Sequence, residues 1–400
     1  MIKKFLKYQG QTTNNPLGLE VVKARGSYIY TKDKKYLDFV AGVSVNNLGH
    51  SNPIINNAII NQLKDYSHVM VYGEFILKPS IKLCELISKI LPSKLNSTYL
   101  TNSGTEAIEA SLKLAKRSTG RQKIISMINS YHGSTHGSLS VSGFEKRKRR
   151  YRPLLPNIFH INFNSLSDLE LIDNSTSCVI VEPIQGGAGF LQANMKFLKD
   201  LRKKCDDMGT ILIFDELQSG LGRTGKMFAF EHYGIIPDIL VIGKALGGGF
   251  PIGALICNKS LMDKFTFNPI LGHITTFGGH PVISKAGIET IKYVLKNNLQ
   301  YKALEKEKLF KSILKHELIS EIRGKGFLIG IKLKVNQKHF IENLFKQQLL
   351  TIKASENVVR ILPPLNVKKS EINKALKIID NVCMRYNLSL IHISEPTRPY

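Results

Sequence analysis

The chain has 400 residues, of which 43% are hydrophobic and 22% are charged. This length accommodates one large α/β domain with a smaller one beside it, and the composition is that of an ordinary globular protein. No stretch approaches the roughly 18 consecutive apolar residues that a membrane-spanning helix needs, and the basic start MIKKFLKYQG lacks the apolar run of a secretory signal. A cytoplasmic location without membrane contact is therefore expected.

The formal net charge of +25 raises the question of a polyanionic partner. The densest basic cluster runs from Lys146 to Arg150 in FEKRKRRYR, and we interpret it as a solvated helix face or a loop near an anionic substrate. The other lysines are spread over amphipathic helices without interleaved aromatic residues. Nucleic-acid binding is kept only as an outside alternative.

The five cysteines are scattered along the chain and form no CxxC pair. Their odd number and irregular spacing favour reduced, mostly buried thiols. Neither a disulfide framework nor a metal site is expected.

Between about residues 95 and 290, short runs rich in Ile and Val alternate with helical patterns. Most of these runs lack a clean polar–apolar alternation, which is typical of strands covered on both faces. Helices are expected at Glu106–Arg117, Met195–Met208 and Pro281–Lys296. Strands separated by helices predict an α/β fold with a mostly parallel, seven-stranded sheet and a site at the carboxyl ends of its strands. The expected strands are STYLTN, KIISMIN, IFHINF, CVIVEPI, TILIFDE, DILVIGK and GALICN.

Both ends of the chain differ from this middle part. Residues 20–40 predict a small antiparallel hairpin with a Lys-Asp-Lys turn, and residues 300–388 predict a helix, strands and a final helix from Lys369 to Tyr386. The two ends are expected to combine into a smaller α+β domain. The predicted parts are 1–50 and 296–388 for the small domain and 51–295 for the large domain.

The last twelve residues, SLIHISEPTRPY (389–400), carry two prolines and are not expected to continue the final helix. They resemble translated sequencing-adapter read-through. We interpret them as a non-native tail and base no function on them.

In TNSGTEAIEA an expected strand ends at Asn102 and a helix starts with Glu106. Backbone N–H groups at such a helix start, with the hydroxyls of Ser103 and Thr105, predict a phosphate cradle. An ordinary helix cap with an acidic first turn is the alternative interpretation.

In TILIFDELQSGLGRTG a buried strand runs directly into Asp215. A buried carboxylate is costly unless it meets a cation, and the protonated pyridine nitrogen of pyridoxal 5′-phosphate (PLP) is such a cation. Gln218 is placed to hydrogen-bond the phenolic oxygen of that ring. An acidic strand end that caps a turn is the alternative here.

In PDILVIGKALGGGFPIGA another buried strand is followed at once by Lys244 and then by Gly247, Gly248 and Gly249. A lysine in a low-dielectric pocket has a lowered pKa, which favours the neutral amine that condenses with an aldehyde. The glycines allow the backbone to pass close to a flat cofactor. Lys244 is therefore the expected attachment point of PLP.

Two further segments carry weaker signals. In SYHGSTHGS, Tyr131 is placed to stack on a cofactor ring, and His132 is either catalytic or a structural, hydrogen-bonded histidine. In GHITTFGGHP, Thr275 and Thr276 are candidate phosphate donors.

Together these segments resemble the class-III, fold-type I aminotransferases, the family of acetylornithine, ornithine and 4-aminobutyrate aminotransferases. The resemblance runs from about residue 15 to 385. Its motifs are LDFVAGVSVNNLGH, NSGTEA, YHGS, EPIQGGAG, FDELQSGLGRTG, PDILVIGKALGGGFPIGA, TTFGGHP, RGKGFLIG and VRILPPL.

The resemblance implies that Lys244 holds PLP covalently and moves protons during catalysis, and that Asp215 pairs with the pyridine nitrogen. It also implies an obligate homodimer with shared active sites, in which Thr276 reaches the phosphate bound to the partner subunit. The cofactor-binding residues expected in total are Ser103, Gly104, Thr105, Tyr131, His132, Glu182, Asp215, Gln218, Lys244 and Thr276.

Two positions depart from the family pattern. Acetylornithine and ornithine enzymes usually carry a substrate-binding arginine where Ser134 stands, and a glutamate that gates a later arginine where Gly187 stands. That later arginine is kept as Arg360, which is expected to bind the α-carboxylate of amino-acid and oxo-acid substrates without a gate. Arg25 is a candidate for the second carboxylate.

The expected activity is transfer of an amino group from an ω-amino acid such as acetylornithine or ornithine to a 2-oxo acid such as 2-oxoglutarate. Ser134 and Gly187 keep open a 4-aminobutyrate- or β-alanine-type ω-transaminase, or an aminomutase of the same family. The sequence does not identify the amino donor.

Overall fold

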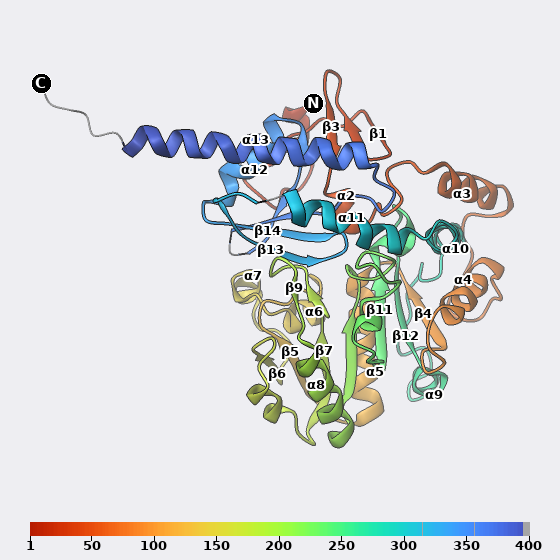
Figure 1. The fold of residues 1–400 in the computed structure, drawn as a ribbon. Coiled ribbons are helices and arrows are strands. Elements are labelled where there is room, and N and C mark those ends of the chain that lie inside the picture. Colours follow the sequence, from red (N-terminus) through yellow and green to blue (C-terminus); the bar gives the residue numbers. More distant parts are fainter. Residues whose placement is uncertain (314, 356, 395–400) are drawn as a thin grey trace, which may run out of the picture.

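The structure is a computed structural model of the chain, and it describes residues 1–313, 315–355 and 357–394. Figure 1 shows two lobes, with the large sheet and its helices in the lower one and the N-terminus and the C-terminal helix in the upper one. Across the residues that the structure describes, no helix combines the length and apolar character needed to cross a bilayer.

A seven-stranded sheet forms the centre of the large lobe. Every neighbouring pair is parallel except the two pairs made by the strand at 253–257, which runs antiparallel to both of its neighbours. All seven predicted strands are present, and the prediction of a mostly parallel sheet is confirmed. In order across the sheet they are β4 (Ser97–Thr101), β12 (Gly253–Cys257), β11 (Ile239–Gly243), β10 (Ile211–Asp215), β7 (Thr176–Val181), β5 (Lys123–Met127) and β6 (Ile158–Ile161).

Both faces of this sheet are buried, which explains why its strands read as continuous apolar runs. Successive residues of β7 point to opposite faces: Cys178 and Ile180 pack with α5 (Gly104–Thr119), whereas Val179 and Val181 belong to the larger core that contains α8 (Met195–Met208). Other helices of this lobe are α3 (Pro53–Asp65), α4 (Lys78–Lys89), α6 (His136–Val141), α7 (Glu145–Lys148), α9 (Lys259–Met262) and α10 (Pro281–Lys296), with 3₁₀ turns η1 (Arg149–Tyr151), η2 (Ser167–Leu171), η3 (Ala229–His232), η4 (Lys244–Gly247) and η5 (Asp263–Thr266).

Strands from the two ends of the chain share a sheet in the upper lobe. The hairpin predicted at 20–40 is present, and its last strand pairs in parallel with a strand from residues 349–350. This sheet is β1 (Lys23–Arg25), β2 (Tyr28–Tyr30), β3 (Lys35–Asp38) and β15 (Leu349–Leu350), and a second one is β13 (Ile319–Lys325), β14 (Leu328–Leu333), β17 (Val358–Ile361) and β16 (Ile352–Lys353). A short ribbon of β8 (Ile184–Gln185) and β9 (Leu191–Gln192) completes the strands, and the remaining helices are α1 (Ile2–Tyr8), α2 (Ala41–Ser44), α11 (Leu299–Ile313), α12 (Gln337–Lys346) and α13 (Lys369–Ser394).

The final helix corrects one expectation. α13 extends past Tyr386 as far as Ser394, so the prediction that the helix stops before residue 389 is wrong. Residues 395–400 of the predicted tail lie outside the described residues, and the exact domain boundaries stay a prediction.

Candidate active site

The register of the central sheet brings three of the predicted segments to one edge. Asp215 ends β10 and lies opposite Val241 of β11, and Lys244 follows the last residue of β11. Gly253 lies opposite Gly243 on one side and opposite Thr101 on the other, just before the start of α5. The strand-end lysine, the strand-end aspartate and the helix start therefore meet where parallel sheets carry their sites.

Lys244 is half-buried, and its amine has no hydrogen-bond or ion-pair partner among the described residues. Its φ of 44° is in the left-handed region, which a non-glycine residue adopts only where the surrounding structure holds it. Burial lowers the pKa of Lys244, with a smaller contribution from Arg360, while Asp215 and Glu182 act in the opposite direction. The site thus favours a neutral, nucleophilic amine.

Asp215 is buried and is held by two contacts. One carboxylate oxygen accepts a hydrogen bond from the backbone N–H of Leu217 at 3.0 Å, and the other shares a hydrogen bond of 2.7 Å with Nδ1 of His132. His132 is itself buried, and its Nε2 has no partner in the part of the chain that the structure describes. Of the two interpretations given to His132, the geometry matches the hydrogen-bonded one, in which it positions Asp215.

Tyr131 is tied to the turn after β7. Glu182 accepts hydrogen bonds from the backbone N–H groups of Tyr131 and Gly186, both at 3.0 Å. Burial, aided by Asp215, raises the pKa of Glu182 to about 7, against the lowering effect of His132 and of those N–H donors. This carboxyl group thereby fixes the backbone on which the Tyr131 ring is mounted.

Gln218 lies over the same turn. A Cβ atom added to Gly186 would lie 1.9 Å from the side-chain oxygen of Gln218, so the amide of Gln218 would have to move if a side chain were present there. The amide of Gln218 reaches Ser44 at 3.4 Å. Gln218 therefore lies beside the segment that carries Glu182, and its contact with the ring oxygen stays a prediction.

The start of α5 has the features of a phosphate cradle. Ser103 caps the helix by accepting a hydrogen bond from the N–H of Glu106 at 3.3 Å, which is the ordinary cap considered above. The hydroxyl of Thr105, however, joins a cluster with Thr135 at 2.8 Å and Ser138 at 2.6 Å, which the sequence did not reveal. Free N–H groups and several hydroxyls at a helix N-terminus suit a phosphate group.

Arg360 lies in β17, in the strand ladder of the smaller lobe. Its guanidinium donates to the carbonyl oxygen of Gly186 at 3.3 Å, and its buried Nε has no partner among the described residues. Burial, and next the charge of Arg147, lowers the pKa of Arg360 to about 10. Arg360 is thus a cation near Lys244 with unused donors.

Three other predicted residues are exposed on the single chain. Arg25 is exposed in β1, and its side chain makes no ion pair or hydrogen bond to a described residue. Thr276 is exposed, with no partner for its side chain within the described chain. Ser134 is exposed, and its hydroxyl lies 3.2 Å from that of Tyr131.

One residue near the site was not singled out from the sequence. Arg147, in α7, lies with its guanidinium carbon 5.2 Å from the ring centre of Tyr131 and 5.0 Å from that of Phe144. The signal was present, because Arg147 belongs to the basic cluster that was interpreted as a solvated face or a loop near an anionic substrate. The neighbouring Lys148 is not solvated but buried, and it donates to the carbonyl oxygen of Ser142 at 2.8 Å.

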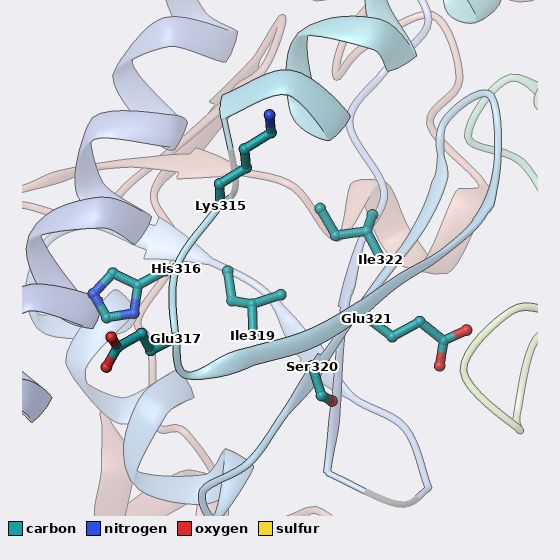
Figure 2. Close-up of a pocket in the computed structure, with 7 residues that line it drawn as sticks. All are labelled: Lys315, His316, Glu317, Ile319, Ser320, Glu321 and Ile322. Carbon is teal, nitrogen blue, oxygen red and sulfur yellow. The ribbon is translucent and has the colours of Figure 1, made fainter.

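A separate pocket lies at the start of β13, outside this site. Figure 2 shows its lining, from Lys315 to Ile322, with Lys315, His316 and Glu317 extending away from the strand. None of the predicted site residues lines it. It is therefore not a candidate for the cofactor.

The residues of the strand-edge site fit PLP on their own chemistry. An unpartnered, weakly basic amine at Lys244 suits an aldehyde, and the anchored carboxylate of Asp215 suits a protonated ring nitrogen. The hydroxyl cluster around Thr105 suits a phosphate. Among the described residues, no group of three or more His, Cys, Asp or Glu side chains is arranged to hold a metal ion.

Known proteins resemble the chain over most of its length. The aminotransferase class-III family matches residues 8–383. The acetylornithine aminotransferase of Clostridium acetobutylicum is 41% identical over 372 residues, covering 90% of this chain and 94% of that protein. The [LysW]-aminoadipate semialdehyde/glutamate semialdehyde transaminase of Sulfolobus acidocaldarius is 38% identical over 368 residues, with the same two coverages.

Solved structures share the fold. An ornithine aminotransferase from Toxoplasma gondii, described with partial occupancy of PLP at its active site, superposes with a TM-score of 0.91 at 26% identity, covering 97% of this chain and 94% of that one. The acetylornithine aminotransferase of Elizabethkingia anophelis gives a TM-score of 0.83 at 27% identity, covering 96% and 98%. Family and fold agree with the predicted cofactor, PLP. The chain belongs to the class-III aminotransferases.

Proposed function

We propose that this aminotransferase takes its amino group from the ω-amine of an ornithine-type amino acid, free or acylated, and passes it to a 2-oxo acid such as 2-oxoglutarate. The observation that carries the proposal is that Lys244 lies near Arg360. Among the described residues, the amine of Lys244 and the buried Nε of Arg360 have no hydrogen-bond partner. The relatives named as an acetylornithine aminotransferase and as a [LysW]-aminoadipate semialdehyde/glutamate semialdehyde transaminase favour this donor class.

In this proposal each residue has a defined task. PLP, when bound, supplies an electron sink for the carbon that carries the amino group. Nζ of Lys244 accepts the proton from that carbon and returns it, a role that needs its lowered pKa. Asp215, anchored by His132, keeps the ring nitrogen protonated, and Arg360 binds the α-carboxylate of the oxo acid.

A 4-aminobutyrate- or β-alanine-type transaminase is the second candidate, with an aminomutase of the same family beside it. The exposed Ser134 and the absence of a side chain at Gly187 favour this candidate, because both positions depart from the acetylornithine pattern. An engineered ω-transaminase also shares the fold, with a TM-score of 0.90 at 25% identity. Nothing beyond the net charge supports nucleic-acid binding, and the cytoplasmic location stays a prediction.

A half-reaction screen tests the donor. Each candidate amine is mixed with the holoenzyme, and the absorbance band of the bound cofactor is followed. Acetylornithine or ornithine is expected to bleach the band at the lowest concentration. A band bleached by 4-aminobutyrate or β-alanine and not by the ornithine-type amines would reverse the order of the two candidates.

We also propose a homodimer with shared sites. The segment around Thr276 and the one before α4 lie together, since the rings of His68 and Phe277 are 4.8 Å apart and Ser80 donates to the carbonyl oxygen of Gly279 at 2.5 Å. Apolar side chains that are exposed on the single chain gather in these segments, as expected for an obligate interface. They are Met70, Phe75, Ile76, Phe267, Ile270, Leu271, Ile274 and Phe277.

A further inference from the structure

A second arginine lies next to Arg360, and the contacts between the two form a continuous chain. Arg360 donates to the carbonyl oxygen of Gly186, the residue before Gly187. Gly187 packs against Phe144, and Arg147 lies over the Phe144 ring and the Tyr131 ring. Burial and, next, the positive charge of Arg147 lower the pKa of Arg360. The two guanidinium groups are therefore joined through Gly186, Gly187 and Phe144, with Arg147 also over the Tyr131 ring.

Among the residues that the structure describes, neither arginine meets a carboxylate that could neutralise the pair. Glu145, the acidic residue of α7, forms an ion pair with Arg152, with N–O distances of 2.8 and 2.9 Å. Glu182 is engaged by two backbone N–H groups. Arg147 makes no ion pair with any described residue, and Nε of Arg360 is buried without a partner. Two close, like charges disfavour each other, and an anion between them removes that cost.

The glycine at 187 is part of this arrangement. A Cβ atom there would lie 2.6 Å from Cε2 and 3.0 Å from Cζ of Phe144, so any side chain at 187 would displace the Phe144 ring. Phe144 thus fills the space beside Gly187 and also supplies one of the two ring faces that hold Arg147. The unusual Gly187, Phe144 and Arg147 form one structural unit.

We propose that Arg147 binds the second carboxylate of a dicarboxylic substrate, while Arg360 binds the first. The inference rests on the proposed function, since it assigns Arg360 to the α-carboxylate of the oxo acid. It gives the enzyme a residue for the distal carboxylate of glutamate or 2-oxoglutarate even though Ser134 has no charge. Arg147 takes this place rather than Arg25, whose side chain has no contact with the site residues.

The test compares two oxo acids that differ only at the distal end. 2-Oxopentanoate has a methyl group where 2-oxoglutarate has its second carboxylate. Arg147→Met keeps a long apolar side chain on the two rings and removes the charge. Since a charged hydrogen bond is typically worth about tenfold or more in affinity, we expect the KM for 2-oxoglutarate to rise by about tenfold or more. The KM for 2-oxopentanoate and the kcat for both should change by less than about threefold.

Two variants serve as controls. Arg149→Met removes an exposed charge from the same basic cluster and should leave both KM values unchanged. Arg147→Lys keeps the charge and should restore part of the affinity for 2-oxoglutarate. As a measurement independent of turnover, glutarate should raise the Tm of the wild-type holoenzyme more than pentanoate does, and Arg147→Met should abolish that difference.

The pyridoxamine-phosphate form of the holoenzyme reacts with oxo acids regardless of the natural amine. Its single-turnover rate, followed against oxo-acid concentration, gives a half-saturating concentration and a maximal rate that take the place of KM and kcat. Equal changes for both oxo acids in Arg147→Met, or no change for either, would overturn the role of Arg147. A wild-type enzyme that accepts 2-oxoglutarate but no ω-amine would instead overturn the proposed donor and leave Arg147 in place.

Discussion

Lys244 has a local environment that acts on its protonation from several sides. Burial and the charge of Arg360 favour the neutral amine, and the carboxyl groups of Asp215 and Glu182 favour the ammonium form. The lysine has no hydrogen bond of its own among the described residues. Its protonation is therefore controlled first by burial and then by neighbouring charges, which can be removed one at a time.

Removing Arg360 should raise the pKa of Lys244, because a nearby positive charge disfavours the ammonium form. The apoprotein is mixed with PLP, the bond at position 244 is trapped with borohydride, and the product is measured by mass spectrometry. The rate of incorporation should rise with pH, and the midpoint, the pH at which it is half-maximal, reports the pKa of Lys244. In Arg360→Met this midpoint should lie at higher pH than in the wild type. Glu182→Gln removes an opposing charge and should lower it.

Arg147→Met is the matched control, since Arg147 is not among the charges that act on Lys244. Its midpoint should coincide with that of the wild type. A midpoint that is the same in Arg360→Met and in the wild type would show that Arg360 does not act on the lysine.

The sequence could indicate residues whose chemistry and position are both visible along the chain. Lys244 and Asp215 each end a buried strand, and Ser103 starts a helix, so their convergence follows from the rule for parallel sheets. The position of Arg147 could not be predicted in this way, since it depends on the contact between Phe144 and Gly187, residues 43 positions apart. The sequence allows two interpretations of His132, because its contact with Asp215 at 2.7 Å depends on residues 83 positions apart in the chain.

The contact between β12 and the start of α5 is the element-scale feature that sets the phosphate cradle. A Cβ atom on Gly253 would lie 2.1 Å from the carbonyl oxygen of Ser103 and 2.5 Å from Oγ1 of Thr101. That carbonyl accepts the hydrogen bonds of Ala107 N–H at 3.2 Å and of the Thr101 hydroxyl at 2.9 Å. The helix start is thus seated directly on the strand.

Gly253→Ala should therefore displace the start of α5. Overpacking costs about 1–3 kcal/mol, so the affinity for PLP is expected to fall by about tenfold or more. Equilibrium titration of the apoprotein with PLP measures the change. Gly10→Ala, where an added Cβ meets no atom within 4 Å, should bind PLP like the wild type. Unaltered affinity in Gly253→Ala would separate the helix start from the cofactor site.

The elements themselves were predictable to different degrees. The seven strands of the large sheet are four to six residues long, mostly apolar and bounded by turns, so each could be assigned from the sequence. Strands of two residues, such as β8 (Ile184–Gln185) and β15 (Leu349–Leu350), are too short to show an alternation of polar and apolar residues. They are defined only by their pairing with β9 and β3. α13 passes residue 386 although the sequence suggested an end there.

At the scale of the whole molecule, one buried side chain joins segments that are far apart in the sequence. Arg223 is fully buried, and its guanidinium donates to the side-chain oxygen of Asn47 and to the carbonyl oxygen of Pro363. No carboxylate pairs with it in the described part of the chain, and burial lowers its pKa to about 9. It links the loop after β10 to both ends of the chain.

Arg223→Ala should destabilise the fold by about 2–4 kcal/mol, because it leaves a cavity and deprives two buried acceptors of their donor. Urea unfolding measures the loss. Arg150→Ala, which removes an exposed arginine, should change the free energy of unfolding by less than about 0.5 kcal/mol. A loss no larger than that of Arg150→Ala would mean that Arg223 is not needed to dock the two ends.

The exposed position of Thr276 has a practical outcome for the proposed dimer. If a second chain supplies this hydroxyl, PLP binds tightly only to the dimer. The fraction of sites that hold PLP should then depend on the protein concentration as well as on the PLP concentration. Dilute solutions of the enzyme should lose their yellow colour at a fixed PLP concentration, and concentrating the same sample should bring the colour back.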